Sequence, residues 1–236
     1  DIGAPYTPLK ASYAGLTTAT PGSGVPGFIT MNTTTRSKLS GSLRLGAARY
    51  GFSGLLNSAG RTTVFPHSGK LPPLILSLRT DLTLGSDEFI GTLSGSNWVA
   101  NVTAYRAAGT ASGYLGKYTL AVSNSLTAGQ GVAAVNVSPT GRLRVKGTLA
   151  DGTAFTQSVP LAANGAWPLY ASLYHGGSIS AWVNLTNSPG AEVAGNGQWL
   201  KVAQANKAYS DVLTNDVSLT GMRYLPPTST TPVFDL

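Results

Sequence analysis

Apolar and polar residues alternate in short runs along most of this chain. In the run 142–149 the odd positions are apolar or glycine, whereas the even positions are Arg142, Arg144, Lys146 and Thr148. A side-chain period of two is typical of a β-strand that buries one face. The pattern therefore predicts strands that turn one apolar face inward and one polar face to solvent.

Such runs recur at short intervals, separated by many of the 29 glycines and 14 prolines. Many short strands joined by turns favour an all-β sandwich or barrel. The sequence shows no convincing amphipathic helix. The best candidate is residues 200–209, which would span one or two turns at most. The first half is expected to hold strands at 12–17, 27–32, 38–45, 49–56, 61–65, 74–79, 89–94 and 98–105. The second half is expected to hold them at 117–122, 132–137, 142–149, 154–161, 169–174, 178–185, 197–202 and 217–224.

The two halves follow one plan, which indicates an internal duplication. Gly27–Asn32 aligns with Gly131–Asn136 at an offset of 104 residues. Pro73–Leu78 aligns with Pro168–Leu173 at an offset of 95, so the second copy is expected to have a shorter loop in place of residues 61–72. We expect two pseudo-repeated antiparallel barrel or sandwich lobes of meandering hairpins, at residues 1–109 and 110–236. The small-residue stretch Ala107–Gly116 is expected to link them.

Several runs of the second half resemble a known kind of module. They are the glycine-flanked strand 141–153, Gln157–Leu161, the aromatic strand Trp167–Tyr174 and the pair Trp182-Val183. Together they resemble a β-rich module that occurs in tandem in large secreted and cell-surface proteins of environmental bacteria. The resemblance implies an exported, non-enzymatic module of undefined function. It brings no functional residues with it.

Charge is concentrated in the first half of the chain. Residues 1–117 hold ten Lys or Arg against four Asp or Glu, whereas residues 118–236 hold six against five. Alternation places several cations of the first half outward, where they could attract a polyanion such as an acidic polysaccharide. A solvated sheet surface is the simpler explanation, and nucleic acid is disfavoured because no recognised binding motif accompanies the charge. The candidate polyanion-binding residues are Arg36, Lys38, Arg44, Arg49 and Arg61.

Aromatic residues suggest a second binding surface. Alternation along residues 167–174 turns Tyr170 and Tyr174 away from the apolar face, and Trp182 on the next strand is also off that face. Three rings on one wall could stack on sugars, because an aromatic face is flat and apolar. The alternative is that these rings pack against the other lobe or a neighbouring module.

The composition argues against catalysis and against cofactors. The chain has no cysteine and two histidines, so thiolate metal sites, cysteine nucleophiles and multi-histidine metal centres are excluded. Neither His67 nor His175 accompanies a Gly-x-Ser-x-Gly elbow, and no spacing specifies a pair of catalytic carboxylates. No cofactor or metal is expected, and an extracellular hydrolase is the remote alternative. With 42% hydrophobic and 11% charged residues the chain is not disordered.

We therefore expect a non-enzymatic structural or adhesive module, outside the cell or on its surface. Its partners would be neighbouring copies or modules of one assembly, or a polysaccharide. No apolar run approaches the ~18 residues of a membrane helix, so membrane insertion is not expected. The extended segments at residues 1–10 and 225–236 could pair with neighbouring subunits as donated strands in a filament. The alternative is a carbohydrate-binding module that uses the outward aromatic rings.

Overall fold

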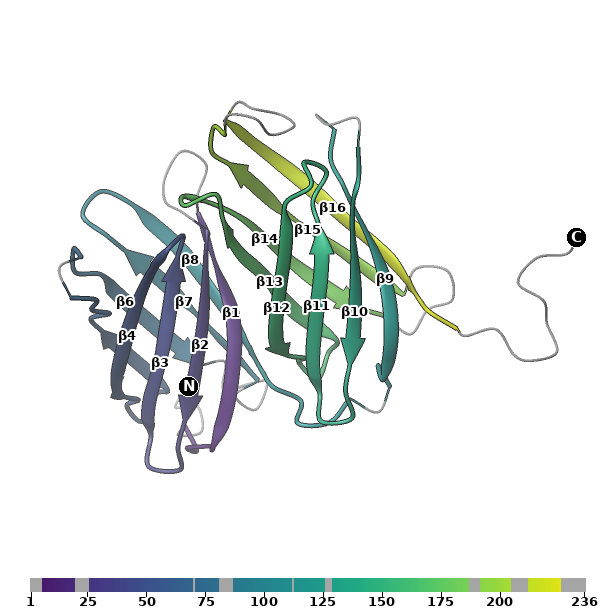
Figure 1. Cartoon of the computed structure of the whole chain (residues 1–236). Helices are drawn as coiled ribbons and strands as arrows, with labels where there is room; N and C mark the ends of the chain where they lie inside the picture. The colour runs from purple at the N-terminus through teal and green to yellow at the C-terminus, as the bar shows by residue number, and fades with distance from the viewer. Residues whose placement is uncertain are drawn as a thin grey trace, which may run out of the picture.

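The computed structural model describes residues 6–19, 26–69, 71–80, 87–111, 113–125, 129–186, 192–204 and 212–225. These residues form sixteen strands and no helix. The strands make two antiparallel eight-stranded sheets, each of which curls into a nearly closed barrel (Figure 1). The predicted all-β class with two barrel-like lobes is therefore confirmed.

Lobe 1 holds the first eight strands and lobe 2 the second eight, and each predicted strand is present within a few residues of its expected bounds. Lobe 1 contains β1 (Ala11–Ala19), β2 (Gly27–Thr33), β3 (Lys38–Leu45), β4 (Ala48–Leu55), β5 (Arg61–Val64), β6 (Ile75–Thr80), β7 (Glu88–Ser94) and β8 (Val99–Arg106). Lobe 2 contains β9 (Gly116–Ser123), β10 (Gly131–Val137), β11 (Arg142–Thr148), β12 (Ala154–Pro160), β13 (Ala166–Leu173), β14 (Gly177–Leu185), β15 (Val193–Lys201) and β16 (Leu213–Arg223).

The two lobes have the same strand order, which supports the internal repeat. Lobe 1 runs β4-β3-β2-β1-β8-β7-β6-β5, and lobe 2 runs β12-β11-β10-β9-β16-β15-β14-β13. The alignment of Gly27–Asn32 with Gly131–Asn136 relates β2 to β10, the second strand of each lobe. The alignment of Pro73–Leu78 with Pro168–Leu173 is wrong, because it relates β6, a sixth strand, to β13, a fifth strand. Residues 61–72 hold β5, so they are not a loop that the second copy lacks.

Side-chain alternation builds the interior of each barrel. In β10 every second residue from Gly131 to Val137 is buried and the residues between are exposed. The lobe 1 interior centres on Tyr13 and Phe89, whose rings meet edge to face with centroids 4.8 Å apart. The lobe 2 interior is larger and includes fully buried Trp167 and Trp199. Each lobe therefore has its own apolar core.

In lobe 1 a short backbone bridge joins the two strands at the ends of the sheet order. The Gly51 N–H of β4 donates to the His67 carbonyl at 2.9 Å, and the His67 N–H donates back to the Gly51 carbonyl at 3.0 Å. His67 follows β5 by three residues. The main chain therefore closes the first barrel at this point.

In lobe 2 a side chain makes the corresponding connection. Gln157 of β12 donates from Nε2 to the Pro168 carbonyl at 3.0 Å and accepts from the Tyr170 N–H at 3.0 Å. Pro168 has no N–H to offer, and proline inside a sheet is tolerated on edge strands. One amide group therefore replaces the missing backbone ladder between β12 and β13.

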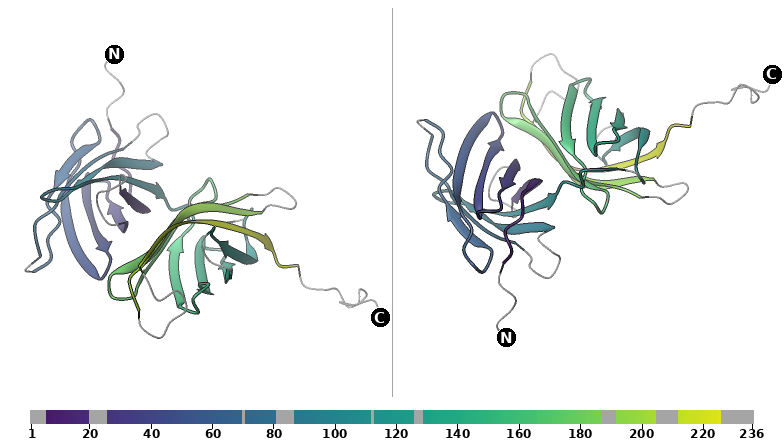
Figure 2. Two further views of the ribbon diagram at one scale, coloured as in Figure 1. Left: turned by 90° about the horizontal axis from the view of Figure 1, so that it is seen from above. Right: turned by 90° about the horizontal axis from the view of Figure 1, so that it is seen from below.

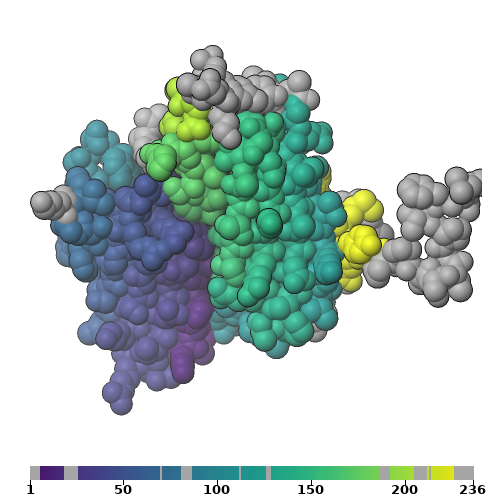
Figure 3. Space-filling model, in the orientation of Figure 1, coloured from purple at the N-terminus to yellow at the C-terminus, as the bar shows by residue number. Residues whose placement is uncertain are grey.

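The lobes pack side by side, with β1 and β2 of lobe 1 against β12 and β13 of lobe 2 (Figures 1 and 2). Their surfaces meet along a continuous boundary in the space-filling view (Figure 3). Ala14 of β1 is 2% exposed and is part of the lobe 2 core. The linker is hydrogen-bonded to both lobes, because Ala107 N–H donates to Ser12 of lobe 1 and Ala108 N–H donates to Leu161 of lobe 2.

Two sequence expectations fall at the margins of the described residues. Of the conceivable helix at 200–209, Leu200 and Lys201 end β15, and residues 205–209 lie outside the described part. Of the N-terminal segment expected to pair with a neighbour, residues 1–5 lie outside it, whereas Tyr6 is buried in lobe 1 and its N–H donates to the Ser58 carbonyl. The C-terminal residues 226–236 also lie outside the described part.

Candidate functional site

A groove of about 930 Å³ runs between the two lobes. Lobe 1 contributes outward residues of β2, β3 and β4, and lobe 2 contributes outward residues of β11 and β12 together with β13. All lining residues belong to the described part of the chain, and none of them carries a carboxylate. The polar and aromatic residues that matter below are Phe28, Thr30, Ser42, Arg44, Arg49, Arg142, Arg144, Gln157, Ser158 and Tyr170.

Four exposed arginines give the groove its charge. Arg44 and Arg49 are cross-strand partners near the turn between β3 and β4. Arg142 and Arg144 occupy successive outward positions of β11, and Arg142 Nε donates to Ser158 Oγ at 2.9 Å. Like charges directly opposite each other on a sheet repel, so an anion held between Arg44 and Arg49 would relieve that repulsion. Guanidinium groups also match carboxylate, sulfate and phosphate geometry with paired donors.

The floor of the groove is an aromatic contact between the lobes. The ring of Tyr170 stacks on Phe28 of lobe 1, with centroids 6.1 Å apart and planes 10° apart. Its hydroxyl oxygen accepts from the Gly46 N–H at 2.8 Å. Burial raises the pKa of Tyr170, while the hydrogen bond from Gly46 and the nearby charge of Arg44 act in the opposite direction. Tyr170 therefore joins the two walls.

The three aromatic rings do not form one exposed wall. Tyr170 is 4% exposed because lobe 1 covers it, and Trp182 packs edge to face on Tyr105 of lobe 1 with centroids 5.1 Å apart. Tyr174 lies at the end of β13, half-buried at one end of the second barrel. Alternation correctly turned Tyr170 and Trp182 off the core face, but the partner lobe covers that face. Tyr170 and Trp182 instead pack against the other lobe, which was the alternative interpretation of these rings.

Tyr174 belongs to a polar cluster inside lobe 2. Its hydroxyl donates to Asp151 Oδ2 at 2.7 Å and accepts from Trp199 Nε1 at 3.1 Å. Lys201 Nζ lies 3.8 Å from Asp151 Oδ2 and 4.8 Å from the centre of the Tyr174 ring, and both charged side chains are fully buried. Burial is the main cause of the raised pKa of Tyr174. The cluster ties β15 to the turns that follow β11 and β13.

The five predicted cationic residues do not share one face. Arg44 and Arg49 line the groove, whereas Arg36 lies in the turn before β3 and Lys38 begins that strand, at its opposite end from Arg44. Arg61 lies on β5, away from the groove. Arg61 points elsewhere because the sheet curves into a barrel, where outward residues of different strands point in different directions.

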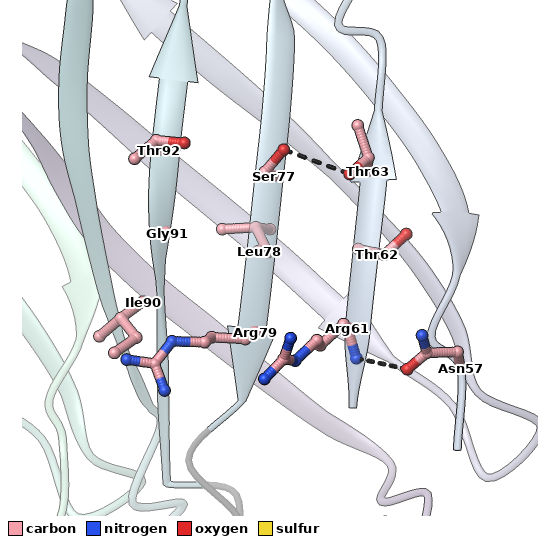
Figure 4. Close-up of a pocket in the computed structure, with 10 residues that line it drawn as sticks. All are labelled: Asn57, Arg61, Thr62, Thr63, Ser77, Leu78, Arg79, Ile90, Gly91 and Thr92. Carbon is pink, nitrogen blue, oxygen red and sulfur yellow. Dashed lines mark hydrogen bonds between the residues drawn. The ribbon is translucent and has the colours of Figure 1, made fainter. Parts of the chain in front are cut away.

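Arg61 borders a separate shallow hollow of about 440 Å³ on the outside of β5, β6 and β7. It is the cross-strand partner of Arg79, and the two side chains extend in the same direction (Figure 4). Thr63 and Ser77 are hydrogen-bonded hydroxyls on the same face, 3.2 Å apart. No described residue forms a second wall facing this pair of arginines, so it is a simpler surface than the groove.

Sequence reasoning missed Arg142, Arg144 and Arg79. The two β11 arginines were placed on the outward face, but the small net charge of the second half concealed their importance. Their juxtaposition with Arg44 depends on how the lobes pack, which the alternation does not encode. A usable signal was present in the pattern itself, since both halves place cations outward on their third strand.

The described residues show no group of three or more His, Asp and Glu side chains arranged to hold a metal ion. His67 and His175 are both exposed, and His175 has a φ of 56° in the turn between β13 and β14. No helix among the described residues is long and apolar enough to cross a bilayer.

Comparison with protein families finds no match, and comparison with curated proteins finds no relative. A search of solved structures returns a protein of unknown function from the DUF3598 family of Nostoc punctiforme. It is 8% identical, with a TM-score of 0.26, over 91% of this chain and 96% of that one.

Proposed function

We propose that this chain is a binding module that holds an anionic polysaccharide in the groove between its lobes. The observation that carries the proposal is that four exposed arginines, two from each lobe, line one groove that contains no carboxylate. The extracellular or cell-surface setting that the sequence resemblance implies would give such a module an adhesive role.

The rest of the groove favours a polysaccharide over nucleic acid. Hydroxyl groups of Thr30, Ser42 and Ser158 line it, and they can bond to sugar hydroxyls. Single-stranded nucleic acids are usually held by aromatic rings on which bases stack. Here the rings of Phe28 and Tyr170 stack on each other, and Tyr170 is buried, so they offer no open face of that kind.

The test is calorimetric titration of the whole chain with heparin, as a sulfated chain, and with polygalacturonate, as a carboxylated one. Dextran serves as the neutral control. The double variant Arg44→Ser/Arg144→Ser removes one cation from each wall. Each charge-assisted hydrogen bond contributes roughly 1.5–3 kcal/mol, so affinity should fall about 10-fold or more.

The matched control is Arg61→Ser/Arg79→Ser, which removes the same charge from outside the groove. It should keep most of the affinity, and both variants should keep the thermal stability of the parent. Equal losses in the two double variants would show that net charge, rather than the groove, binds the polymer. Tighter binding of a single-stranded oligonucleotide than of either polysaccharide would also overturn the proposal.

A further inference from the structure

The contact between the two lobes shows which kind of surface covers the opening between β12 and β13. Outward residues of β1 and β2 cover it: Ala14 and Leu16 are each 2% exposed, and Phe28 packs against the lobe 2 core. The strands involved contact one another directly, β1 with both β12 and β13. A face of one lobe therefore covers the place where the other lobe lacks a backbone ladder.

Lobe 2 carries the equivalent face, and no described residue covers it. The 104-residue offset relates Phe28 to Val132, which is 59% exposed. Ala121 lies opposite Val132 in the ladder, and Met222, 57% exposed, lies opposite Thr119. We call this surface the β9–β10 face, and it consists of Thr119, Ala121, Val132, Ala134 and Met222.

In lobe 1 the equivalent seam, between β4 and β5, is closed by the Gly51–His67 backbone bridge, and residues on its outer side are apolar. Leu55, Phe65 and Ile75 are 69%, 66% and 46% exposed. Val64 pairs with Leu76, so the next residue, Phe65, continues toward Ile75. These three residues define the β4–β5 rim. Exposed apolar side chains gathered at one place mark interaction surfaces more often than isolated ones do.

The β9–β10 face and the β4–β5 rim belong to different lobes and lie on different sides of the barrels. In each lobe β4 and β5, or β12 and β13, end the strand order, whereas β1 and β2, or β9 and β10, lie inside it. Lobe 1 covers lobe 2 with its β1–β2 face, whereas no described residue covers its own β4–β5 rim. In lobe 2 the opening between β12 and β13 is covered and the β9–β10 face is not. We propose that the β9–β10 face of one copy seats on the β4–β5 rim of the next, repeating the contact that joins the lobes within the chain. Such a heterologous contact does not close on itself and yields a head-to-tail filament.

Charge makes this assembly distinguishable from binding of a polyanion. Lys146 borders the β9–β10 face, and Lys38 lies opposite Leu55 in the β3–β4 ladder beside the rim. Both surfaces are therefore flanked by cations that repel across the contact. Salt screens such repulsion, so the filament should grow as ionic strength rises, whereas binding of an anionic polysaccharide should weaken.

The experiment is sedimentation velocity of the whole chain over a wide concentration range, in about 0.15 M and about 1 M salt. We expect species larger than dimers that increase with concentration and with salt. Val132→Lys alters the face and Phe65→Lys alters the rim, and each should abolish the polymers. Val212→Lys, at a residue 67% exposed but outside both surfaces, should leave them unchanged.

Mixing the two defective variants gives the decisive result. Val132→Lys retains an intact rim and Phe65→Lys an intact face, so the mixture should form one-to-one heterodimers that grow no further. A chain that stays monomeric at the highest concentration and salt overturns the proposal. Assembly that stops at a dimer in the parent chain, or a mixture without heterodimers, does so as well. Circular dichroism confirms that each variant is folded.

Discussion

The two lobes share a strand order but close their barrels by different means. Met31 of β2 and Val135 of β10 are equivalent by the offset of 104 residues. In lobe 1 Met31 pairs with Gly41, which pairs with Phe52 of β4. In lobe 2 Val135 pairs with Val145, which pairs with Gln157 of β12, so Phe52 and Gln157 occupy equivalent positions. Phe52 is an apolar part of the lobe 1 core, and the adjacent Gly51 makes the backbone bridge to His67. At the equivalent position Gln157 makes the closing hydrogen bonds with its side chain.

The comparison shows that the second barrel combines its closure with binding to the first. Gln157 bridges β12 and β13 with its side chain, and lobe 1 occupies the space outside this bridge with Ala14 and Phe28. Lobe 2 also holds a buried ion pair in its interior. Its stability should therefore depend on a few polar residues, whereas that of lobe 1 should depend on apolar packing and main-chain bonds.

The largest effect is expected from Lys201→Met in lobe 2. The substitution leaves the buried carboxylate of Asp151 without a cation, and breaking a buried ion pair from one side costs about 3–5 kcal/mol. Chemical denaturation followed by tryptophan fluorescence measures it, because Trp167, Trp182 and Trp199 lie in lobe 2.

The matched control is the double variant Lys201→Met/Asp151→Asn, which removes both charges. It should recover much of the lost free energy of unfolding, since no unpaired charge remains. A double variant as unstable as the single one would show that packing of the lysine stem, rather than the charge pair, is what matters.

The next effect is expected from Gln157→Leu. The Pro168 carbonyl and the Tyr170 N–H lose their partner, and each buried unsatisfied group costs roughly 1–3 kcal/mol. We expect a total of about 2–4 kcal/mol, with faster hydrogen exchange in β12 and β13. Ser158→Ala, one residue along and facing outward, should stay within about 0.5 kcal/mol of the parent chain. Unchanged exchange in β13 would mean that Gln157 does not close the barrel.

Both closures illustrate what the sequence could and could not predict. Alternation and turn residues located all sixteen strands, because a period of two reports which face of a strand is buried. The same alternation gives no hint that Gln157 bonds to a different strand. The groove was predicted in part, through Arg44 and Arg49. Its second wall depends on the packing of two lobes about a hundred residues apart in sequence, which no local pattern records.

Alkaline pH should test lobe 1 through Tyr13. Burial is the main cause that raises the pKa of its hydroxyl from 10.0 to about 12. Because the folded pKa exceeds the unfolded one, the neutral ring stabilises the fold fully below pH 10, and this contribution is lost as pH rises through about 12. At ~1.36 kcal/mol per pKa unit the loss approaches roughly 2.7 kcal/mol.

Thermal unfolding between neutral and strongly alkaline pH measures this loss. Tyr13→Phe keeps the edge-to-face contact with Phe89 and should reduce the decline, leaving the share from Tyr174 of lobe 2, whose pKa burial raises further. If the variant and the parent chain lose stability in parallel, Tyr13 does not control the alkaline limit of lobe 1.

The smallest effect distinguishes backbone from side chain at the lobe 1 closure. His67 is exposed and takes part in the bridge through its main chain alone, so His67→Ala should change the free energy of unfolding by less than about 0.5 kcal/mol. His67→Pro removes the N–H that donates to the Gly51 carbonyl, which should cost roughly 1 kcal/mol. Hydrogen exchange should then quicken in β4 and β5 and remain unchanged in β12 and β13. Equal costs for the two substitutions would assign the closure to the imidazole. Both barrels would then close through side chains, and the contrast with Gln157 would disappear.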